Sequence, residues 1–274
     1  MDNRFYKLIA SDFDGTLLKS DGSISDETLS TIKRFTDTGG IFSISTGRTL
    51  QSILPIARRL GLQGIVSCFN GSVVAEIESG KVLFEKNFSL EESVNICQCL
   101  EELGLHINAY EIDEFYSNKR NDLLEIYEKI CGVKAVVVEE KLSSYIAKNK
   151  LKIVKFLTLI DERERNQILL RIKEKLGNKC YVTSGGKFIV ELCSKGFDKG
   201  SAVEFITNHY QIPLEDTIAV GDALNDLPAL QRVGLGIAVA NAELELKEKV
   251  FVFDKTNDEN AIKHIIEKFT KVNS

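Results

Sequence analysis

Apolar and polar positions follow two different spacings along the first third of the chain. Short apolar runs, typical of buried strands, occupy residues 5–11, 41–45 and 65–68. Between them, apolar residues recur every three or four positions, as in amphipathic helices that begin near residue 25 and pass through residues 53–60. This order of strand, helix, strand, helix, strand predicts a parallel sheet with right-handed crossovers, whose ligands bind at the carboxyl ends of the strands.

The same alternation returns late in the chain, with a helix over residues 202–206 and strands at 217–220, 235–239 and 250–253. The middle of the chain, after a hairpin-like stretch at residues 73–84, has a different pattern. It predicts helix 89–103, strands 106–110 and 114–117, helix 123–130, strand 134–138, a short helix near Tyr145, strand 152–159, helix 162–176 and a hairpin that pairs Tyr181-Val182 with residues 188–190. Ser89 with Glu92, and Asp161 with Glu164, have the spacing of helix-capping pairs.

We therefore expect an α/β fold, namely a Rossmann-like parallel-sheet core with an inserted α+β domain. Residues 1–85 and 194–274 are predicted to form the two parts of the core, and residues 86–193 the insertion. A chain of 274 residues, 43% of them hydrophobic, is long enough to bury the cores of two modest domains.

Composition narrows the classes of partner. The chain has 35 Lys and Arg against 40 Asp and Glu, a net charge of -5 and no basic tail, which argues against nucleic acid. The N-terminal residues 1–4 lead into a strand, and no stretch approaches the roughly 18 apolar residues of a membrane helix. The six cysteines form no Cys-x-x-Cys pair, so we expect reduced, mostly buried thiols. These features predict a soluble cytoplasmic protein with no membrane partner, either a monomer or a weak homo-oligomer.

The segment Asp12-Phe13-Asp14-Gly15-Thr16 has the clearest chemical meaning. Two carboxylates two residues apart at the end of a strand share one side, so they can converge on one cation or one phosphoryl group. A divalent metal is the simplest way to relieve their mutual repulsion. The alternative is a plain turn, because Asp and Gly both favour turns. An EF-hand calcium loop is excluded, because its glycine stands at the sixth position and Gly15 stands at the fourth.

Three further polar motifs adjoin predicted core elements. Ser45-Thr46-Gly47-Arg48 ends the second strand, Gly221 to Asp226 ends a later one, and Lys199 lies at the start of a core helix. The structural alternatives are an N-cap for Thr46, a solvated surface residue for Arg48, an ordinary helix-start cation for Lys199, and turn or capping roles for Asp222 and Asp226. Four polar motifs at one edge of one sheet nevertheless favour a shared site for an anion.

In this order, the motifs resemble those of the haloacid dehalogenase (HAD) superfamily of phosphotransferases. The chain as a whole resembles its Cof-type phosphatases with a type IIB cap. Residues 12–17 match the first motif, Thr46 the second, Lys199 the third, and Gly221-Asp222 with Asn225-Asp226 the fourth. The inserted segment is similar in element order to that cap, so the resemblance covers essentially the whole chain.

The resemblance implies a phosphatase that hydrolyses a small phosphorylated metabolite, a sugar phosphate or similar, through a phosphoaspartate. Asp12 would be the nucleophile, and Asp14 the general acid and base. Mg²⁺ would be held by the Asp12 carboxylate, the Asp14 main-chain carbonyl and Asp222, with Asp226 in a supporting role. The residues that would bind the substrate are Thr46, Gly47, Arg48, Asn70, Gly71, Lys199 and Asn225, of which Thr46 and Lys199 would also assist catalysis.

Two other functions stay open. One is a sugar phosphomutase, and the other is a non-catalytic protein that binds phosphorylated metabolites. An aspartate at position 14 favours hydrolysis of a phosphoenzyme, because a haloacid dehalogenase does not use this second acid and the related P-type ATPases carry threonine there. The turn from Ser184 to Lys187 is interpreted as a plain hairpin turn, with contact to the substrate as the alternative.

Overall fold

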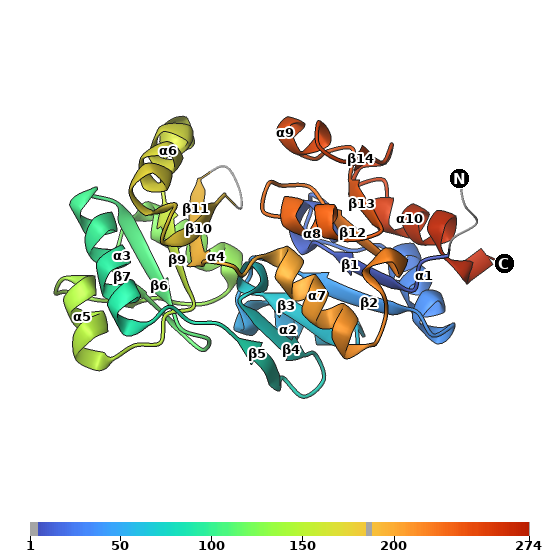
Figure 1. Ribbon diagram of the computed structural model, residues 1–274, viewed down its shortest axis with the longest axis horizontal. Helices are drawn as coiled ribbons and strands as arrows, with labels where there is room; N and C mark the ends of the chain where they lie inside the picture. The colour runs from blue at the N-terminus through green and yellow to red at the C-terminus, as the bar shows by residue number, and fades with distance from the viewer. Residues whose placement is uncertain (1–4, 185–187, 274) are drawn as a thin grey trace.

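The computed structural model describes residues 5–184 and 188–273, which are arranged around two sheets (Figure 1). The larger sheet contains β1 (Leu8–Ser11), β2 (Ile41–Ser45), β3 (Ile65–Cys68), β4 (Val73–Glu76), β5 (Val82–Glu85), β12 (Thr217–Gly221), β13 (Leu235–Ala238) and β14 (Phe251–Val252). Their order is β14-β13-β12-β1-β2-β3-β4-β5. The pairing is parallel from β14 to β3 and antiparallel from β3 to β5. The predicted parallel-sheet core is thereby confirmed.

The strand order changes direction beside β1, and this change locates the functional edge of the sheet. The chain runs from β1 through β2 to β3 on one side, whereas β12 pairs on the other side. Ser11, the last residue of β1, pairs with Ile44 of β2 and Val220 of β12. The residues that follow these strands, Asp12 and Asp222 among them, therefore leave the sheet at one edge. In such sheets, ligands bind where the strand order reverses.

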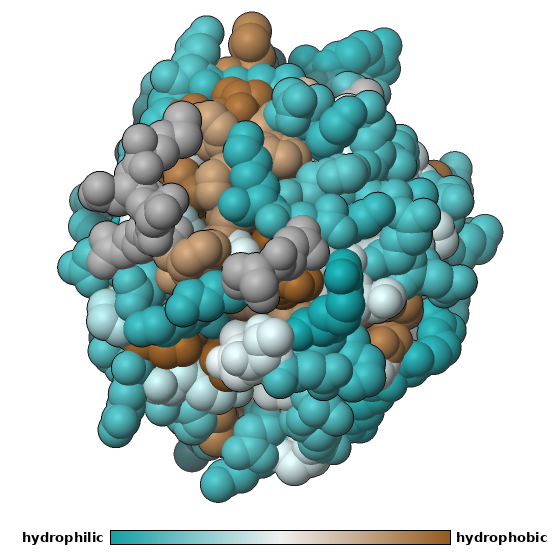
Figure 2. Space-filling view, turned by 90° about the vertical axis from the view of Figure 1, so that its right-hand side faces the viewer, coloured by the Kyte–Doolittle hydropathy of each residue, from teal (hydrophilic) through white to brown (hydrophobic). Residues whose placement is uncertain are grey.

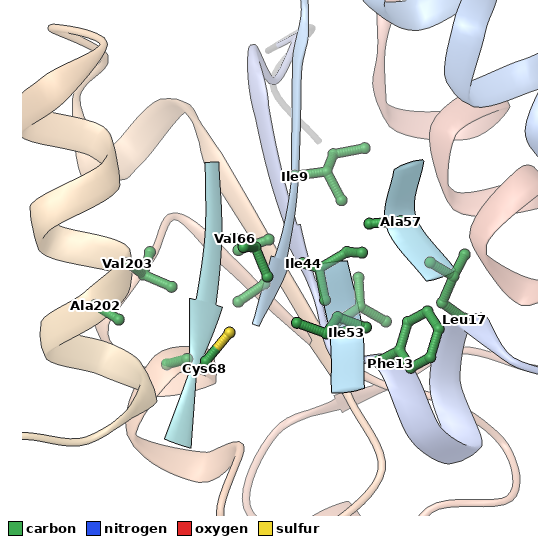
Figure 3. Packing of buried hydrophobic residues seen from close by; sticks show 14 of the residues in the cluster. Ile9, Phe13, Leu17, Ile44, Ile53, Ala57, Val66, Cys68, Ala202 and Val203 are labelled. Atoms are coloured by element: carbon green, nitrogen blue, oxygen red, sulfur yellow. The ribbon is translucent and has the colours of Figure 1, made fainter. Parts of the chain in front are cut away.

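Helices cover both faces of this sheet. They are α1 (Asp26–Asp37), α2 (Leu50–Arg59), α7 (Lys199–His209), α8 (Leu227–Arg232), α9 (Leu244–Lys247) and α10 (Ala261–Phe269). Figure 3 shows Ala202 and Val203 of α7 beside Cys68 of β3, whereas Ile53 of α2 lies with Ile44 on the other side. Because apolar side chains cover both faces, the inner strands β1, β3 and β12 are buried throughout their length, which holds the loops at their carboxyl ends in place.

The second sheet is built from the inserted segment. Its strands are β6 (His106–Tyr110), β7 (Phe115–Ser117), β8 (Val136–Val137), β9 (Lys155–Leu159), β10 (Cys180–Thr183) and β11 (Ile189–Ser194), in the order β10-β11-β9-β6-β7-β8. The helices of this segment are α3 (Leu90–Glu102), α4 (Asp122–Cys131), α5 (Leu142–Asn149) and α6 (Arg165–Leu176). The pairs are antiparallel except β7 with β8. This mixture of helices and mainly antiparallel strands agrees with the predicted α+β insertion.

The predicted pairing of the last hairpin is wrong. Tyr181 pairs with Cys193 and Val182 with Leu192, so β10 lies opposite the second half of β11 and not opposite residues 188–190. Residues 189–193 also pair with β9. A strand that pairs on both sides can extend beyond one neighbour, and β11 does so at Ile189 and Val190, which pair with β9 but not with β10. Its other end, Ser194, pairs with Cys180 and lies one residue past the predicted boundary of the insertion.

Several predicted element limits also change. The Ser89–Glu92 capping box is confirmed at α3. Asp161 instead caps a short 3₁₀ turn at residues 162–164, and α6 begins only at Arg165 without a side-chain cap. The strands are shorter than predicted at residues 5–11, 134–138, 152–159 and 250–253, and α8, α9 and α10 were not predicted. Two of these helices have only six and four residues, too few for a recognisable period.

The surface at the core end of the molecule is mainly hydrophilic, with apolar residues in small separate groups (Figure 2). Among the described residues, no helix has both the length and the apolar character needed to cross a membrane. All six cysteines are unpaired and four are buried, as predicted.

Candidate active site

A buried lysine joins two of the predicted acidic residues. Nζ of Lys199 donates hydrogen bonds to Oδ1 of Asp12 and to Oδ1 of Asp226, each at 2.6 Å. Lys199 is the first residue of α7 and is 1% exposed, whereas Asp12 directly follows β1. The alternative of an ordinary helix-start cation is therefore wrong. Both contacts are charge-assisted hydrogen bonds, which are stronger than neutral ones.

Asp226 also shapes the loop that follows β12. Its Oδ2 accepts the main-chain N–H groups of Asp222 and Ala223, both at 3.0 Å. Asp226 therefore stabilises the turn, as the structural alternative predicted, and also binds Lys199. Asp222, in the same loop, accepts a hydrogen bond on Oδ1 from the Thr16 hydroxyl at 3.1 Å.

The loop after β1 approaches this acidic loop closely. Gly15 has φ +76°, and a Cβ at this position would lie 2.4 Å from Oδ2 of Asp222. Only glycine fits there without displacing the carboxylate. One carboxylate oxygen from each of Asp12, Asp222 and Asp226 lies within 4.8 Å of the other two, so these side chains could share a metal ion.

Burial and mutual interaction strongly shift the pKa values of the ionisable groups in this cluster. Burial raises the pKa of Asp12 well above its usual range, and the carboxylates of Asp226 and Asp222 raise it further, although Lys199 opposes the change. Burial and Asp226 raise the pKa of Asp222 to about 7. Burial alone would lower the pKa of Lys199, but Asp12 and Asp226 outweigh it and the pKa rises. The arrangement therefore keeps a lysine cation among carboxylates that are crowded in a poorly solvated site.

The loop after β2 fixes Asp14. Arg48 donates from Nε to Oδ2 of Asp14 at 2.8 Å and from Nη2 to Oδ1 at 2.7 Å, and its guanidinium lies over the ring of Phe13. Oγ1 of Thr46 accepts the main-chain N–H of Arg48 at 3.1 Å. The N-cap of α2 is Thr49, so the N-cap alternative for Thr46 is wrong. The alternative of a solvated Arg48 is also wrong, because its side chain is only 18% exposed.

Asn70 connects the core with the inserted segment. Its Oδ1 accepts Nδ2 of Asn225 at 3.0 Å, and its Nδ2 donates to Oε2 of Glu191 at 2.7 Å. Oε1 of Glu191 accepts Nζ of Lys155 at 2.5 Å, and the same ammonium donates to the carbonyl of Gly47 at 2.8 Å. Lys155 and Glu191 are both buried. A continuous series of polar contacts thus runs from the insertion to two of the predicted substrate-binding residues, Gly47 and Asn225.

Gly71, in the turn after β3, allows the core loops to pack closely. Its φ is +101°, and a Cβ would lie 2.2 Å from the carbonyl oxygen of Asp198. Asp198 is the N-cap of α7, so this contact supports the position of Lys199 one residue later. The structure thereby places Gly71 beside the helix start and not in the cavity lining described next.

A cavity of about 450 Å³ brings together most of the predicted site residues. Its lining includes Asp12, Asp14, Thr46, Gly47, Arg48, Asp222 and Asn225. Lys199, Asp226 and Asn70 lie behind this lining and contact it through Asp12, the Asp222 amide and Asn225. The remaining lining residues are Thr49, Ala223 and Glu243 from the core and Tyr127, Ile130, Cys131, Leu157, Phe188, Ile189 and Glu191 from the insertion.

Two buried charges of the site were missed in the sequence. Lys155 interrupts the apolar run Ile153-Val154-Lys155-Phe156-Leu157, and Glu191 interrupts Ile189-Val190-Glu191-Leu192. A single charge inside an apolar strand is the signal that could have identified them, because a buried charge requires a partner. Of the predicted turn from Ser184 to Lys187, residues 185–187 lie outside the described residues.

Comparison with known proteins gives matches over almost the whole chain. Residues 9–266 match the family model for haloacid dehalogenase-like hydrolases. A Haemophilus influenzae protein is 28% identical over 263 residues, which cover 96% of this chain and 97% of that protein. The HMP-PP phosphatase of Yersinia pestis is 26% identical over 245 residues, 89% of this chain and 88% of that protein.

Solved structures share the fold. A haloacid dehalogenase-like hydrolase from B. subtilis superposes with a TM-score of 0.85 at 24% identity and covers 96% of this chain and 99% of that chain. A HAD subclass IIB sugar phosphatase has a TM-score of 0.82 at 21% identity and covers 96% of this chain and 98% of that chain. The predicted family and enzyme class, a HAD-type phosphoric monoester hydrolase, are confirmed by the family match and the named relatives. The chain therefore belongs to the haloacid dehalogenase-like hydrolases.

Proposed function

We propose that the protein is a Mg²⁺-dependent phosphatase that hydrolyses a small phosphorylated metabolite through an aspartyl phosphate on Asp12. The observation that carries this proposal is the position of Asp12, which lines the cavity while Lys199 donates to its Oδ1 at 2.6 Å. The ammonium orients the carboxylate and offsets negative charge beside it. Both effects favour the approach of a phosphate dianion to a carboxylate nucleophile.

The charges of the site fit a divalent cation. Among the described residues, the Lys199 ammonium pairs with Asp12 and Asp226, and Asp222 adds a third carboxylate, so this cluster of four groups has a formal excess of two negative charges in a poorly solvated site. Carboxylate and carbonyl oxygens are the ligands that Mg²⁺ prefers. The Asp12 and Asp222 carboxylates and the Asp14 main-chain carbonyl would hold it. Bound Mg²⁺ would reduce the repulsion between Asp12 and the phosphate.

The reaction would proceed in two displacements. Asp12 attacks phosphorus, the bond from phosphorus to the ester oxygen breaks, and Asp14 donates its proton to that oxygen. A water molecule then attacks the aspartyl phosphate while Asp14 takes a proton from it, which releases inorganic phosphate and regenerates Asp12 and the protonated Asp14. The position of Asp14 in the cavity lining supports this role.

The transferring phosphoryl oxygens would be bound by the Thr46 hydroxyl, the Gly47 amide, Lys199 and the Asn225 side-chain amide. The side-chain nitrogen of Asn225 carries two N–H bonds and donates one of them to Asn70. The other N–H is left for the substrate. Arg48 would contact the substrate from the Asp14 side of the cavity. Asn70 and Gly71 would act by positioning Asn225 and the start of α7.

The inserted segment, residues 86–193, would act as the cap that closes over the core formed by residues 1–85 and 194–274. The separate sheet of the insertion supports this division. Two contacts hold the insertion against the core: Lys155 binds the Gly47 carbonyl, and Glu191 binds Asn70. Closure would exclude water other than the attacking molecule. Cytoplasmic location and a monomer or weak homo-oligomer stay predictions.

The test is phosphate release from p-nitrophenyl phosphate with and without Mg²⁺, on the parent protein and on Asp12→Asn, Asp14→Asn and the exposed control Asp254→Asn. We expect Asp12→Asn to abolish turnover with an unchanged circular dichroism spectrum, and Asp254→Asn to be fully active. Acid quenching and mass spectrometry should detect phosphate on the Asp12 peptide, at higher occupancy in Asp14→Asn. Substantial turnover by Asp12→Asn would exclude the covalent route.

Two further measurements, interconversion of hexose phosphates and binding of phosphorylated ligands, separate the other functions. A phosphomutase would interconvert hexose phosphates in the presence of a bisphosphorylated sugar without releasing phosphate. A binding protein would retain phosphorylated ligands without any turnover.

A further inference from the structure

The two ends of the catalytic cavity differ in chemistry. Among the residues that the structure describes, all but one of the charged residues in the lining come from the core, around Asp12. The inserted segment contributes six residues that are apolar or aromatic or carry a thiol, together with one carboxylate, and these seven are Tyr127, Ile130, Cys131, Leu157, Phe188, Ile189 and Glu191. Because the phosphoryl group must lie at Asp12, the rest of the substrate extends toward this second end.

The polar groups that the described residues of the insertion contribute to the lining have protein partners. Both oxygens of Glu191 are engaged, Oε1 by Lys155 and Oε2 by Asn70. The thiol of Cys131 lies 3.6 Å from the carbonyl oxygen of Val133. Of the described residues that the insertion contributes to the lining, Tyr127 alone keeps an uncommitted donor.

The hydroxyl group of Tyr127 still has a hydrogen to donate. Its hydroxyl oxygen accepts the Tyr110 hydroxyl at 2.8 Å, so its own O–H is left to donate. When a substrate binds in this region, its hydroxyl groups lose their hydrogen bonds to water. A hydroxyl group that finds no hydrogen-bond partner on the protein makes binding less favourable.

Apolar surface at the same end is exposed. Ile130, on α4, is 54% exposed although it lines the cavity, and Phe188 and Ile189 are only partly buried. The ring of Tyr127 is held in place by Phe115, with ring centroids 6.2 Å apart in an edge-to-face arrangement. Exposed apolar surface in a concave site is stabilised when an apolar group covers it. A cavity of about 450 Å³ has the size of a small-molecule site.

We propose that the leaving group of the substrate is an apolar ring with few or no hydroxyl groups, of the kind that aromatic and heteroaromatic alcohols provide, and not a hexose. This inference rests on the proposed phosphatase function and narrows it. Burial of the ring against Ile130, Leu157 and Phe188 would provide the binding energy, and the Tyr127 hydroxyl could donate to one polar atom on the ring. Selection against hexose phosphates would come from their unpaired hydroxyls.

Two phosphate esters and one acyl phosphate separate this inference from the proposed function. Benzyl phosphate and glucose 6-phosphate both carry a six-membered ring on a phosphorylated CH₂ group, and they differ mainly in ring polarity. Acetyl phosphate has a leaving group too small to cover the insertion side. We expect all activity to depend on Asp12, and kcat/KM for benzyl phosphate to exceed that for glucose 6-phosphate by at least about tenfold.

The outcomes are distinguishable. If none of the three compounds is hydrolysed in an Asp12-dependent reaction, the proposed function itself fails. If hydrolysis depends on Asp12 and glucose 6-phosphate equals or exceeds benzyl phosphate in kcat/KM, the function stands and the leaving-group inference is overturned.

A matched pair of variants tests the residues directly. Ile130→Asn makes the second end polar, and we expect it to lower the ratio of kcat/KM for benzyl phosphate to that for acetyl phosphate by about three- to tenfold. Ile126→Asn changes an isoleucine one turn earlier on α4 that is 49% exposed and lies outside the cavity lining, so the ratio should stay constant. Equal ratios in the two variants would contradict the assignment of Ile130 to the leaving group.

Discussion

The guanidinium of Arg48 donates two parallel hydrogen bonds to the carboxylate of Asp14, at 2.7 and 2.8 Å. Such a bidentate pair fixes both the position and the rotation of a carboxylate. The Asp14 side chain is otherwise 53% exposed, so little packing holds it. We infer that Arg48 is the residue that keeps Asp14 turned toward the cavity.

Replacing Arg48 with methionine should therefore impair acid catalysis. General acids contribute about 10²–10⁴-fold to a rate, and we expect Arg48→Met to lose about 10- to 100-fold in kcat/KM for an alkyl phosphate. The loss should be smaller for p-nitrophenyl phosphate, whose leaving group needs no proton. Steady-state kinetics with both esters measures the difference, and Arg59→Met, at an exposed position of α2, is the control. An equal loss with both esters would show that Arg48 acts on the phosphoryl group and not through Asp14.

The ion pair of Lys155 and Glu191 predicts a large loss of stability when it is broken. The side chains are 1% and 5% exposed, and their closest atoms are 2.5 Å apart. Lys155→Met leaves the Glu191 carboxylate buried without its cation, which should lower the free energy of unfolding by about 3–5 kcal/mol. The double variant Lys155→Met/Glu191→Leu should recover part of this loss, because no unpaired charge is left. Urea unfolding measures both.

Lys152→Met is the matched control, because Lys152 is exposed three residues earlier. Its effect should stay within about 0.5 kcal/mol. If Lys155→Met lowers the free energy of unfolding by less than about 1 kcal/mol, as expected for a surface ion pair, the buried pair does not contribute the predicted stability.

Features of the site that depend on short stretches of sequence could be predicted. Asp12 and Asp222 each follow an apolar strand, and strand ends of a parallel sheet meet at one edge, so their proximity could be predicted. The Rossmann-like core could be predicted for the same reason, since its strands and helices have strong periodic patterns.

Features that depend on pairing between distant segments could not be predicted. Arg48 and Asp14 are 34 positions apart, and Asn70 and Glu191 are 121 apart. No local pattern specifies which polar groups will meet across such separations. The register of β10 against β11 was missed for a related reason, because β11 pairs with β9 as well and its alignment depends on both neighbours.

Loss of Asp222 should weaken the binding of Mg²⁺ in a measurable way. Asp222→Asn removes one of the oxygen ligands assigned to the metal while retaining a similar shape. We expect the Mg²⁺ concentration for half-maximal activity to rise by roughly 100-fold, and excess chelator to abolish the activity of the parent protein reversibly. Asp254→Asn, at an exposed position of the part of the chain that forms the larger sheet, should leave the Mg²⁺ dependence unchanged. An unchanged Mg²⁺ dependence in Asp222→Asn would exclude Asp222 as a ligand.

Glu128 anchors α4, the helix that carries three residues of the cavity lining. Its side chain is fully buried and accepts hydrogen bonds from Lys134 at 2.8 Å, from the main-chain N–H of Ala135 at 2.9 Å and from Arg120 at 3.4 Å. Burial alone would raise the pKa of Glu128, but these donors outweigh it and lower the pKa to about 2. The stabilisation is therefore complete above the ordinary pKa of a glutamate and is lost as the pH falls toward 2.

Glu128→Gln should consequently lower the free energy of unfolding at pH 7 by about 1–3 kcal/mol, because it removes the charge from a set of charge-assisted hydrogen bonds. The difference from the parent protein should shrink between about pH 4.5 and pH 2, where the parent loses the same stabilisation by protonation. Chemical unfolding at several pH values measures this convergence. Glu125→Gln, at an exposed position of the same helix, should follow the parent protein throughout. If the gap between Glu128→Gln and the parent stays constant down to pH 2, Glu128 does not stabilise α4 through its charge.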